Sequence, residues 1–134
     1  MCIPKYIMKK YYFIKPDMDL HDNLMAFGFE CGEGWYPIIE EAFDKIEETI
    51  EKMPKKEKKI FKQSFEILQV KEKLGGLRIN INMHTDEINK IIQDAEEKAS
   101  ITCEICGNPG KMRDINHWYS TNCDDCYNKK IRGE

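Results

Sequence analysis

Four cysteines near the C-terminal end are the residues of this chain best suited to chemistry. They form two Cys-x-x-Cys pairs, Cys103 with Cys106 and Cys123 with Cys126, with 16 residues between the pairs. A two-residue gap lets both thiolates of a pair point at one ion, and two pairs complete the tetrahedral coordination that zinc prefers. The spacing therefore predicts a structural Zn²⁺ site that organises its surroundings and performs no catalysis.

The alternative for these cysteines is a pair of redox motifs. Such motifs usually open a helix after a strand in a larger α/β domain, and the tail after residue 100 is short for that. Two further cysteines, Cys2 and Cys31, lie outside the pairs. We interpret both as free buried thiols rather than as extra ligands or a disulfide.

Length and composition favour one small domain with a zinc appendage, or two very small units. The chain has 134 residues, of which 41% are hydrophobic and 34% are charged, which is enough for a modest core. No apolar run approaches the ~20 residues of a membrane span, and the N-terminal segment lacks a signal-peptide pattern. We therefore expect a cytoplasmic protein with reduced thiols and no membrane partner.

The net charge of −3 is unevenly distributed. Residues 30–51 carry eight acids and one base, whereas residues 52–78 carry nine bases and three acids. Residues 103–134 carry five of each, and a zinc finger that grips DNA is usually plainly basic. A nucleic-acid or nucleotide binder is therefore better placed on the basic 52–78 face than on the zinc unit.

Hydrophobic periodicity predicts an α+β fold, in which a small antiparallel sheet packs on helices. Strands are expected at residues 5–14, about 64–71 and 77–83. Helices are expected from a cap at Asp17 or Asp19 to about Phe29, from Trp35 to Met53, and after a Thr85 cap to Ala99. Lys55–Lys59 is interpreted as a basic connector, and Glu72–Gly76 as a hairpin turn.

The same pattern divides the chain into an α+β domain at residues 1–100 and a four-cysteine zinc-binding unit at residues 101–134. A knuckle, a hairpin and a helix carrying the second cysteine pair would make the unit a treble clef, with a zinc ribbon as the alternative. Two sets of residues are candidates for binding. Around the hairpin turn they are Lys71, Lys73, Gly75, Gly76 and Arg78, which could cradle an anion or form a solvated turn. In the zinc loop they are Lys111, Arg113 and Trp118, where Trp118 could instead cover the thiolates.

Three motifs in order resemble a family of small uncharacterised proteins that are common in phages and prophages. The motifs are Cys31–Ile39, Gln69–Arg78 and Cys103–Gly110, followed by Trp118 and the closing Cys-x-x-Cys. Many relatives end in Cys-x-x-His, so the fourth ligand here is a variation. The resemblance implies a bacterial host cytoplasm during infection or lysogeny.

Small phage proteins without catalytic motifs often bind and block host factors. From the resemblance we expect a zinc-containing, non-enzymatic binding protein whose partner is a host protein or a component of host defence. Self-association into a homo-oligomer also stays open. An HNH-like nuclease built around His117 is the third interpretation, and it is weakened because Tyr127 stands where a metal-binding histidine is expected.

Overall fold

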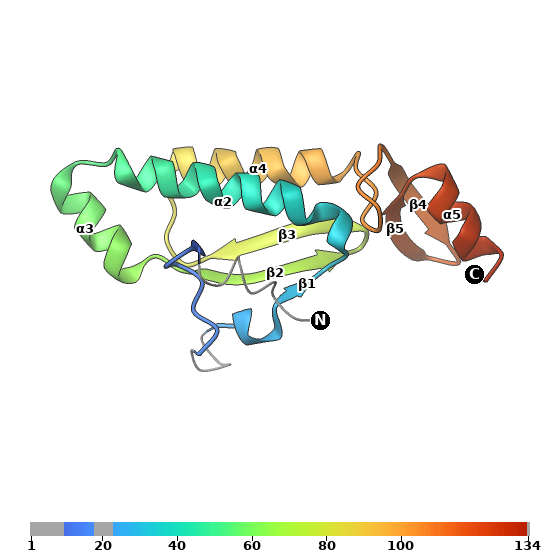
Figure 1. The fold of residues 1–134 in the computed structure, drawn as a ribbon, viewed down its shortest axis with the longest axis horizontal. Coiled ribbons are helices and arrows are strands. Elements are labelled where there is room, and N and C mark those ends of the chain that lie inside the picture. The colour runs from blue at the N-terminus through green and yellow to red at the C-terminus, as the bar shows by residue number, and fades with distance from the viewer. Residues whose placement is uncertain (1–9, 18–22, 134) are drawn as a thin grey trace.

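The computed structural model describes residues 10–17 and 23–133, and its fold is α+β. A three-stranded sheet lies under two long helices, which run side by side along one of its faces (Figure 1). The sheet consists of β1 (Phe29–Glu30), β2 (Ile67–Lys73) and β3 (Gly76–Ile81), and the helices are α2 (Tyr36–Glu51) and α4 (Asp86–Ala99). Helix α3 (Lys55–Ser64) lies at one end of the sheet. The opposite end carries the C-terminal unit, with β4 (Lys111–Ile115), β5 (Trp118–Asn122) and α5 (Asp124–Ile131).

The two long helices form where the sequence predicts them. In α2 the apolar positions recur every three or four residues and are buried, from Ile38 to Ile50, and Pro37 occupies the first turn, where no N–H is needed. Trp35 is fully buried in the short 3₁₀ turn η2 (Glu33–Trp35) that leads into α2. Thr85 caps α4, because its Oγ1 accepts the N–H of Ile88 at 3.1 Å. The buried stripes of both helices cover the sheet.

The predicted hairpin is confirmed with different bounds. Strand β2 begins at Ile67 rather than near residue 64, β3 ends at Ile81 rather than at residue 83, and the turn is Leu74–Gly75 rather than Glu72–Gly76. The turn residues Leu74 and Gly75 have φ of 51° and 83°, which suits the twist of a two-residue hairpin. Leu77, Ile79 and Ile81 are buried under the helices, and the residues between them point the other way.

The expectation of a purely antiparallel sheet is wrong, because β1 pairs with β2 in parallel, with Phe29 in register with Val70. The strand expected at 5–14 is also wrong for its described part. Residues 11–14 form a turn in which the Ile14 N–H donates to the Tyr11 carbonyl at 3.3 Å. Tyr11 and Phe13 are buried and pack edge-on against Phe43. This aromatic run therefore fills the core without joining the sheet, and residues 5–9 lie outside the described residues.

The helix expected from Asp17 or Asp19 to Phe29 is wrong where the structure describes it. Residues 23–30 hold only the 3₁₀ turn η1 (Met25–Phe27) and the strand β1. The Asn23 side chain accepts the Met25 N–H at 2.7 Å and donates to the Ile67 carbonyl at 2.9 Å. Such side-chain bonds compete with helix formation, and Gly28 at φ 74° then turns the chain into β1.

The interpretation of Lys55–Lys59 as a connector is wrong, since these residues open helix α3. Pro54 precedes the first turn, lysine is a good helix former, and Phe61 is buried. The helix lies at the end of the sheet opposite the C-terminal unit, whereas the β2–β3 turn lies next to that unit (Figure 1). The basic residues between 52 and 78 therefore occupy two separate surfaces rather than one.

Candidate metal centre

The four paired cysteines come together at the C-terminal unit. Their Sγ atoms all lie within 4.8 Å of one another, and Cys106 and Cys123 are separated by 3.6 Å. A tetrahedral zinc site with Zn–S bonds of about 2.3 Å places neighbouring sulfurs about 3.8 Å apart. All four thiols are free of disulfide bonds. The cluster can therefore hold one metal ion, as the spacing predicts.

Local backbone structure positions both pairs. The first pair lies on a tight turn in which the Gly107 N–H donates to the Cys103 carbonyl at 2.9 Å. Gly107 has φ of 83°, the left-handed conformation expected after a zinc knuckle. Cys123 caps α5 and Cys126 lies in the first turn, so that the Cys126 N–H points at the Cys123 sulfur at 3.4 Å.

A buried polar chain supports one of the ligands. The Asn122 amide donates to the Cys103 sulfur at 3.9 Å, and Ser120 Oγ donates to Asn122 Oδ1 at 2.8 Å. Both residues are buried, and they share a face of β5 because they are two positions apart. Groups that orient metal ligands in this way tune the affinity of the site. Sequence reasoning missed them, because Ser120, Thr121 and Asn122 are all polar and show no alternation that would mark a buried face.

The four thiols have different acidities. Burial alone would raise the pKa of Cys103, but N–H groups led by that of Cys106 outweigh it and bring the pKa down to about 6. Partial burial and the neighbouring thiols raise the pKa of Cys126 to about 12. Four thiols this close resist ionising together, and a bound divalent cation reverses that balance by deprotonating its ligands.

The loop before α2 packs directly on the first cysteine pair. The Gly34 N–H donates to the Glu104 carbonyl at 2.7 Å, and the Trp35 indole N–H donates to the Thr102 carbonyl at 2.8 Å. A Cβ on Gly34 would lie 2.2 Å from the Cys103 carbonyl oxygen. Only glycine fits such an approach of two backbones, so this motif docks the sheet domain onto the knuckle.

The β2–β3 turn packs on the same unit, where it contacts the β4–β5 hairpin. The Gly75 carbonyl accepts the Thr121 hydroxyl at 2.7 Å, and a Cβ on Gly75 would lie 2.5 Å from the Met112 sulfur. The Gly75 N–H donates to Glu72 Oε2 at 2.6 Å. An anion cradled at this turn would have to replace that carboxylate. The three motifs of the sequence therefore meet at one junction.

Other candidate binding residues have different surroundings. Arg113 is nearly buried: it donates to Asp124 at 2.6 Å and to the Asn122 carbonyl at 3.2 Å, and it lies 4.5 Å from the ring centre of Tyr127. It therefore fastens α5 to the hairpin. Lys111 is exposed, as are Lys73 and Arg78, and Gly76 is half-buried. Their roles in binding stay predictions.

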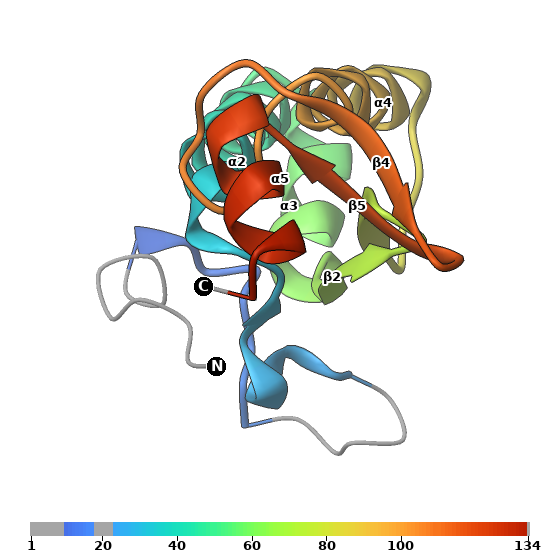
Figure 2. The same cartoon turned by 90° about the vertical axis from the view of Figure 1, so that its right-hand side faces the viewer.

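Trp118 does not belong to a core around the metal. Its side chain is 73% exposed, at the closed end of the β4–β5 hairpin, where it pairs with Ile115. We call Ile115–Trp118 the hairpin tip. Its two turn residues, Asn116 and His117, have φ of 52° and 67°, and the His117 N–H donates to Asp114 Oδ1 at 2.7 Å. Figure 2 shows this end of the hairpin at the margin of the molecule.

The described surface has two larger hollows. One of about 400 Å³ lies between α2 and α4 and is lined by residues that include Lys45, Lys52 and Lys90. The other, of about 270 Å³, lies beside the β4–β5 hairpin and is lined by residues that include Lys111, Arg113 and Asp124.

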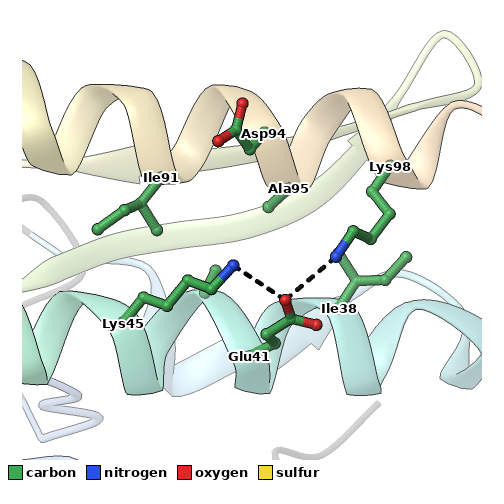
Figure 3. Close-up of a pocket in the computed structure, with 8 residues that line it drawn as sticks. Ile38, Glu41, Lys45, Ile91, Asp94, Ala95 and Lys98 are labelled. Atoms are coloured by element: carbon green, nitrogen blue, oxygen red, sulfur yellow. Dashed lines mark hydrogen bonds and ion pairs between the residues drawn. The ribbon is translucent and has the colours of Figure 1, made fainter.

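A smaller pocket between α2 and α4 has a volume of about 20 Å³, enough for about one water molecule. Glu41 lies at its mouth and pairs with Lys45 at 3.0 Å and Lys98 at 3.1 Å (Figure 3). These two hydrogen bonds lower the Glu41 pKa. The Glu41–Lys98 pair therefore links α2 to α4 across this pocket.

Cys31 is confirmed as a free buried thiol, while Cys2 lies outside the described residues. Burial, followed by the charges of Glu104 and Glu72, raises the pKa of Cys31 to about 12. In the described part of the chain, no helix has the length and apolar character needed to cross a membrane. Comparison with models of protein families, with curated proteins and with solved structures finds no match for the chain.

Proposed function

We propose that this chain is a zinc-stabilised, non-enzymatic binding protein whose partner contacts the hairpin tip. The observation that carries this proposal is the exposure of Trp118, at 73%, on a hairpin anchored to the metal centre. Tryptophan is enriched among the residues that dominate binding energy at protein interfaces. A large aromatic side chain exposed beside a short turn is suited to enter a pocket on another protein.

Zinc is the ion that best suits four thiolates at tetrahedral spacing. It would hold the knuckle at residues 103–107 against α5 and so fix the base of the hairpin. The order of knuckle, hairpin and helix supports a treble clef rather than a zinc ribbon. Arg113 adds a second fastening between β4 and α5. Such preorganisation reduces the entropy lost when the tip binds.

The partner class and the cellular setting rest on the resemblance to phage and prophage proteins. We propose a bacterial host protein, or a component of host defence, in the cytoplasm. A nuclease has less support. Among the described residues, the four-cysteine site is the only group of histidine, cysteine and acidic side chains placed to hold a metal, and a four-thiolate site leaves no open position for substrate.

Native mass spectrometry of the protein purified from its bacterial host would test the proposal. One zinc per chain and a stoichiometric co-purifying protein are expected. Trp118→Ala should weaken that complex by about 2 kcal/mol, roughly thirtyfold in Kd. Ile60→Ala is the matched control, because Ile60 is 54% exposed on α3 at the far end of the molecule. Equal affinity of the Trp118→Ala variant and the wild type would refute a contact at the tip.

A further inference from the structure

The sheet face that points away from α2 and α4 carries three cations, and the alternation of strand residues separates them from the acid between them in the sequence. In the sequence Lys71-Glu72-Lys73, charges of both signs alternate. Because successive residues of a strand point to opposite faces, Lys71 and Lys73 share the face away from α2 and α4. Glu72 points the other way and accepts the Gly75 N–H at 2.6 Å. The amino-acid composition alone does not show that the strand places its lysines and its glutamate on opposite faces.

Arg78 completes the group from the neighbouring strand. It is the direct register partner of Lys71 in the β2–β3 ladder. Its guanidinium donates to the Leu77 carbonyl at 2.9 Å and lies over Gly76, where a Cβ would be 3.0 Å away. The cations Lys71, Lys73 and Arg78, which we call the basic strip, therefore gather next to the hairpin turn.

The charges of the basic strip are only weakly compensated within the described residues. None of its three members forms an ion pair there, whereas every lysine of α2 and α4, namely Lys45, Lys90 and Lys98, is paired. The one acid on this face, Glu30, is in register with Lys71 but accepts from the Gln69 amide at 3.0 Å. Like charges placed directly opposite each other in a sheet are destabilising. A bound polyanion would remove that repulsion.

We propose that the basic strip binds the phosphate backbone of single-stranded nucleic acid. Alternate residues of a strand lie about 6.6 Å apart, a spacing of the same order as that between phosphates in an extended single strand. The Arg78 guanidinium can contact phosphate oxygens in a forked arrangement that lysine cannot make. The amides of Gln69 and Asn80, linked at 3.5 Å on the same face, can hydrogen-bond to base edges. This site is separate from the hairpin tip and does not depend on the function proposed for it.

Fluorescence anisotropy with a labelled oligodeoxythymidylate of about 20 nucleotides, longer than most single-strand sites, would test the proposal. Zinc-loaded wild-type protein should bind, and binding should weaken from about 50 mM to about 200 mM salt. The triple variant Lys71→Gln, Lys73→Gln, Arg78→Gln should lose at least about tenfold in affinity. Its slope of log K against log salt should be shallower by about 2, at about 0.7 per phosphate contact.

The triple variant Lys55→Gln, Lys56→Gln, Lys59→Gln is the matched control, because it removes the same charge from exposed positions on α3. It should bind the oligonucleotide as the wild type does. Equal losses in the two triple variants, or no binding by the wild type, would overturn the proposal. Equal binding of oligoglutamate would also overturn it, in favour of an acidic protein ligand. Circular dichroism melts would establish that both variants fold.

Discussion

The indole N–H of Trp35 donates a 2.8 Å hydrogen bond to the carbonyl of Thr102, which lies 67 residues further along the chain. This bond joins the buried start of α2 to the residue immediately before the first metal ligand. Together with the Gly34 and Gly75 contacts, it packs the metal unit directly against the sheet domain. We therefore expect the folding of the two parts to be coupled.

Removal of one metal ligand should destabilise the whole C-terminal unit. Cys106→Ser should abolish tight metal binding and melt the C-terminal unit, because apparent zinc affinities of about 10–16 kcal/mol are coupled to folding of such units. Metal content and hydrogen exchange of residues 103–131 measure both effects. Cys31→Ala is the control, since this buried thiol lies outside the cluster and its loss should leave the metal in place. Full metal content in Cys106→Ser would contradict a four-cysteine site.

Gly34→Ala should loosen the junction. The added Cβ would meet the Cys103 carbonyl oxygen at 2.2 Å, so the two backbones must separate, at a cost of about 1–3 kcal/mol in unfolding free energy. Urea denaturation measures the loss, and faster release of metal to a chelator reports on the knuckle. At Gly133 a Cβ would meet nothing within 4 Å, so Gly133→Ala should carry only local backbone strain. Identical metal release from both variants would argue against the contact.

Asn122→Ala should weaken metal binding by about tenfold to a hundredfold, as is typical for groups that orient metal ligands. The substitution removes the amide that donates to the Cys103 sulfur and leaves Ser120 Oγ without its acceptor. Competition with a chelator of known affinity gives the change. Thr121→Val is the neighbouring control, because it deletes only the bond to the Gly75 carbonyl. If Thr121→Val lowered metal affinity equally, the loss would come from weaker packing of the β2–β3 turn on the C-terminal unit and not from the bond between Asn122 and Cys103.

Tyr11→Phe should alter the stability of the protein in alkaline solution. Burial, and then the hydrogen bond to the Asp44 carboxylate, raises the pKa of the Tyr11 phenol. A raised folded-state pKa gives stability that is complete below the ordinary pKa of about 10 and is lost as the pH rises above it. At neutral pH the variant should be about 1 kcal/mol less stable. Denaturation at several pH values should show this gap closing above about pH 10, and parallel curves would contradict it.

Features set by local pattern were predictable from the sequence. The periodicity of α2, the Thr85 cap of α4 and the glycine turn at Gly75 each depend on residues close together in the chain. Helix α3 was not predicted, because a run of lysines is typical of a solvated linker. Only the fold shows that Phe61 is buried and gives the helix an apolar face. Strand β1 was not predicted, because a strand of two residues forms only by pairing with the edge of another strand, here β2.

The candidate site divides in the same way. The spacing of the cysteines predicts the metal cluster, because two turns are enough to bring each pair together. Neither the docking of Gly34 on Cys103 nor the bond from Asn122 to Cys103 could be predicted. Both join residues brought together only by the fold. Three glycines of the first two motifs, Gly32, Gly34 and Gly75, therefore serve close packing that their sequence neighbours do not reveal.

The arrangement of helices and sheet also gives the molecule an electrical polarity. Helix α2 carries six acids and one base, and α4 carries five acids and two bases, all above the sheet. The basic strip lies on the opposite face. A charged partner approaching by diffusion would therefore be turned toward one side before any contact forms, and salt would slow that encounter more than it would hasten dissociation.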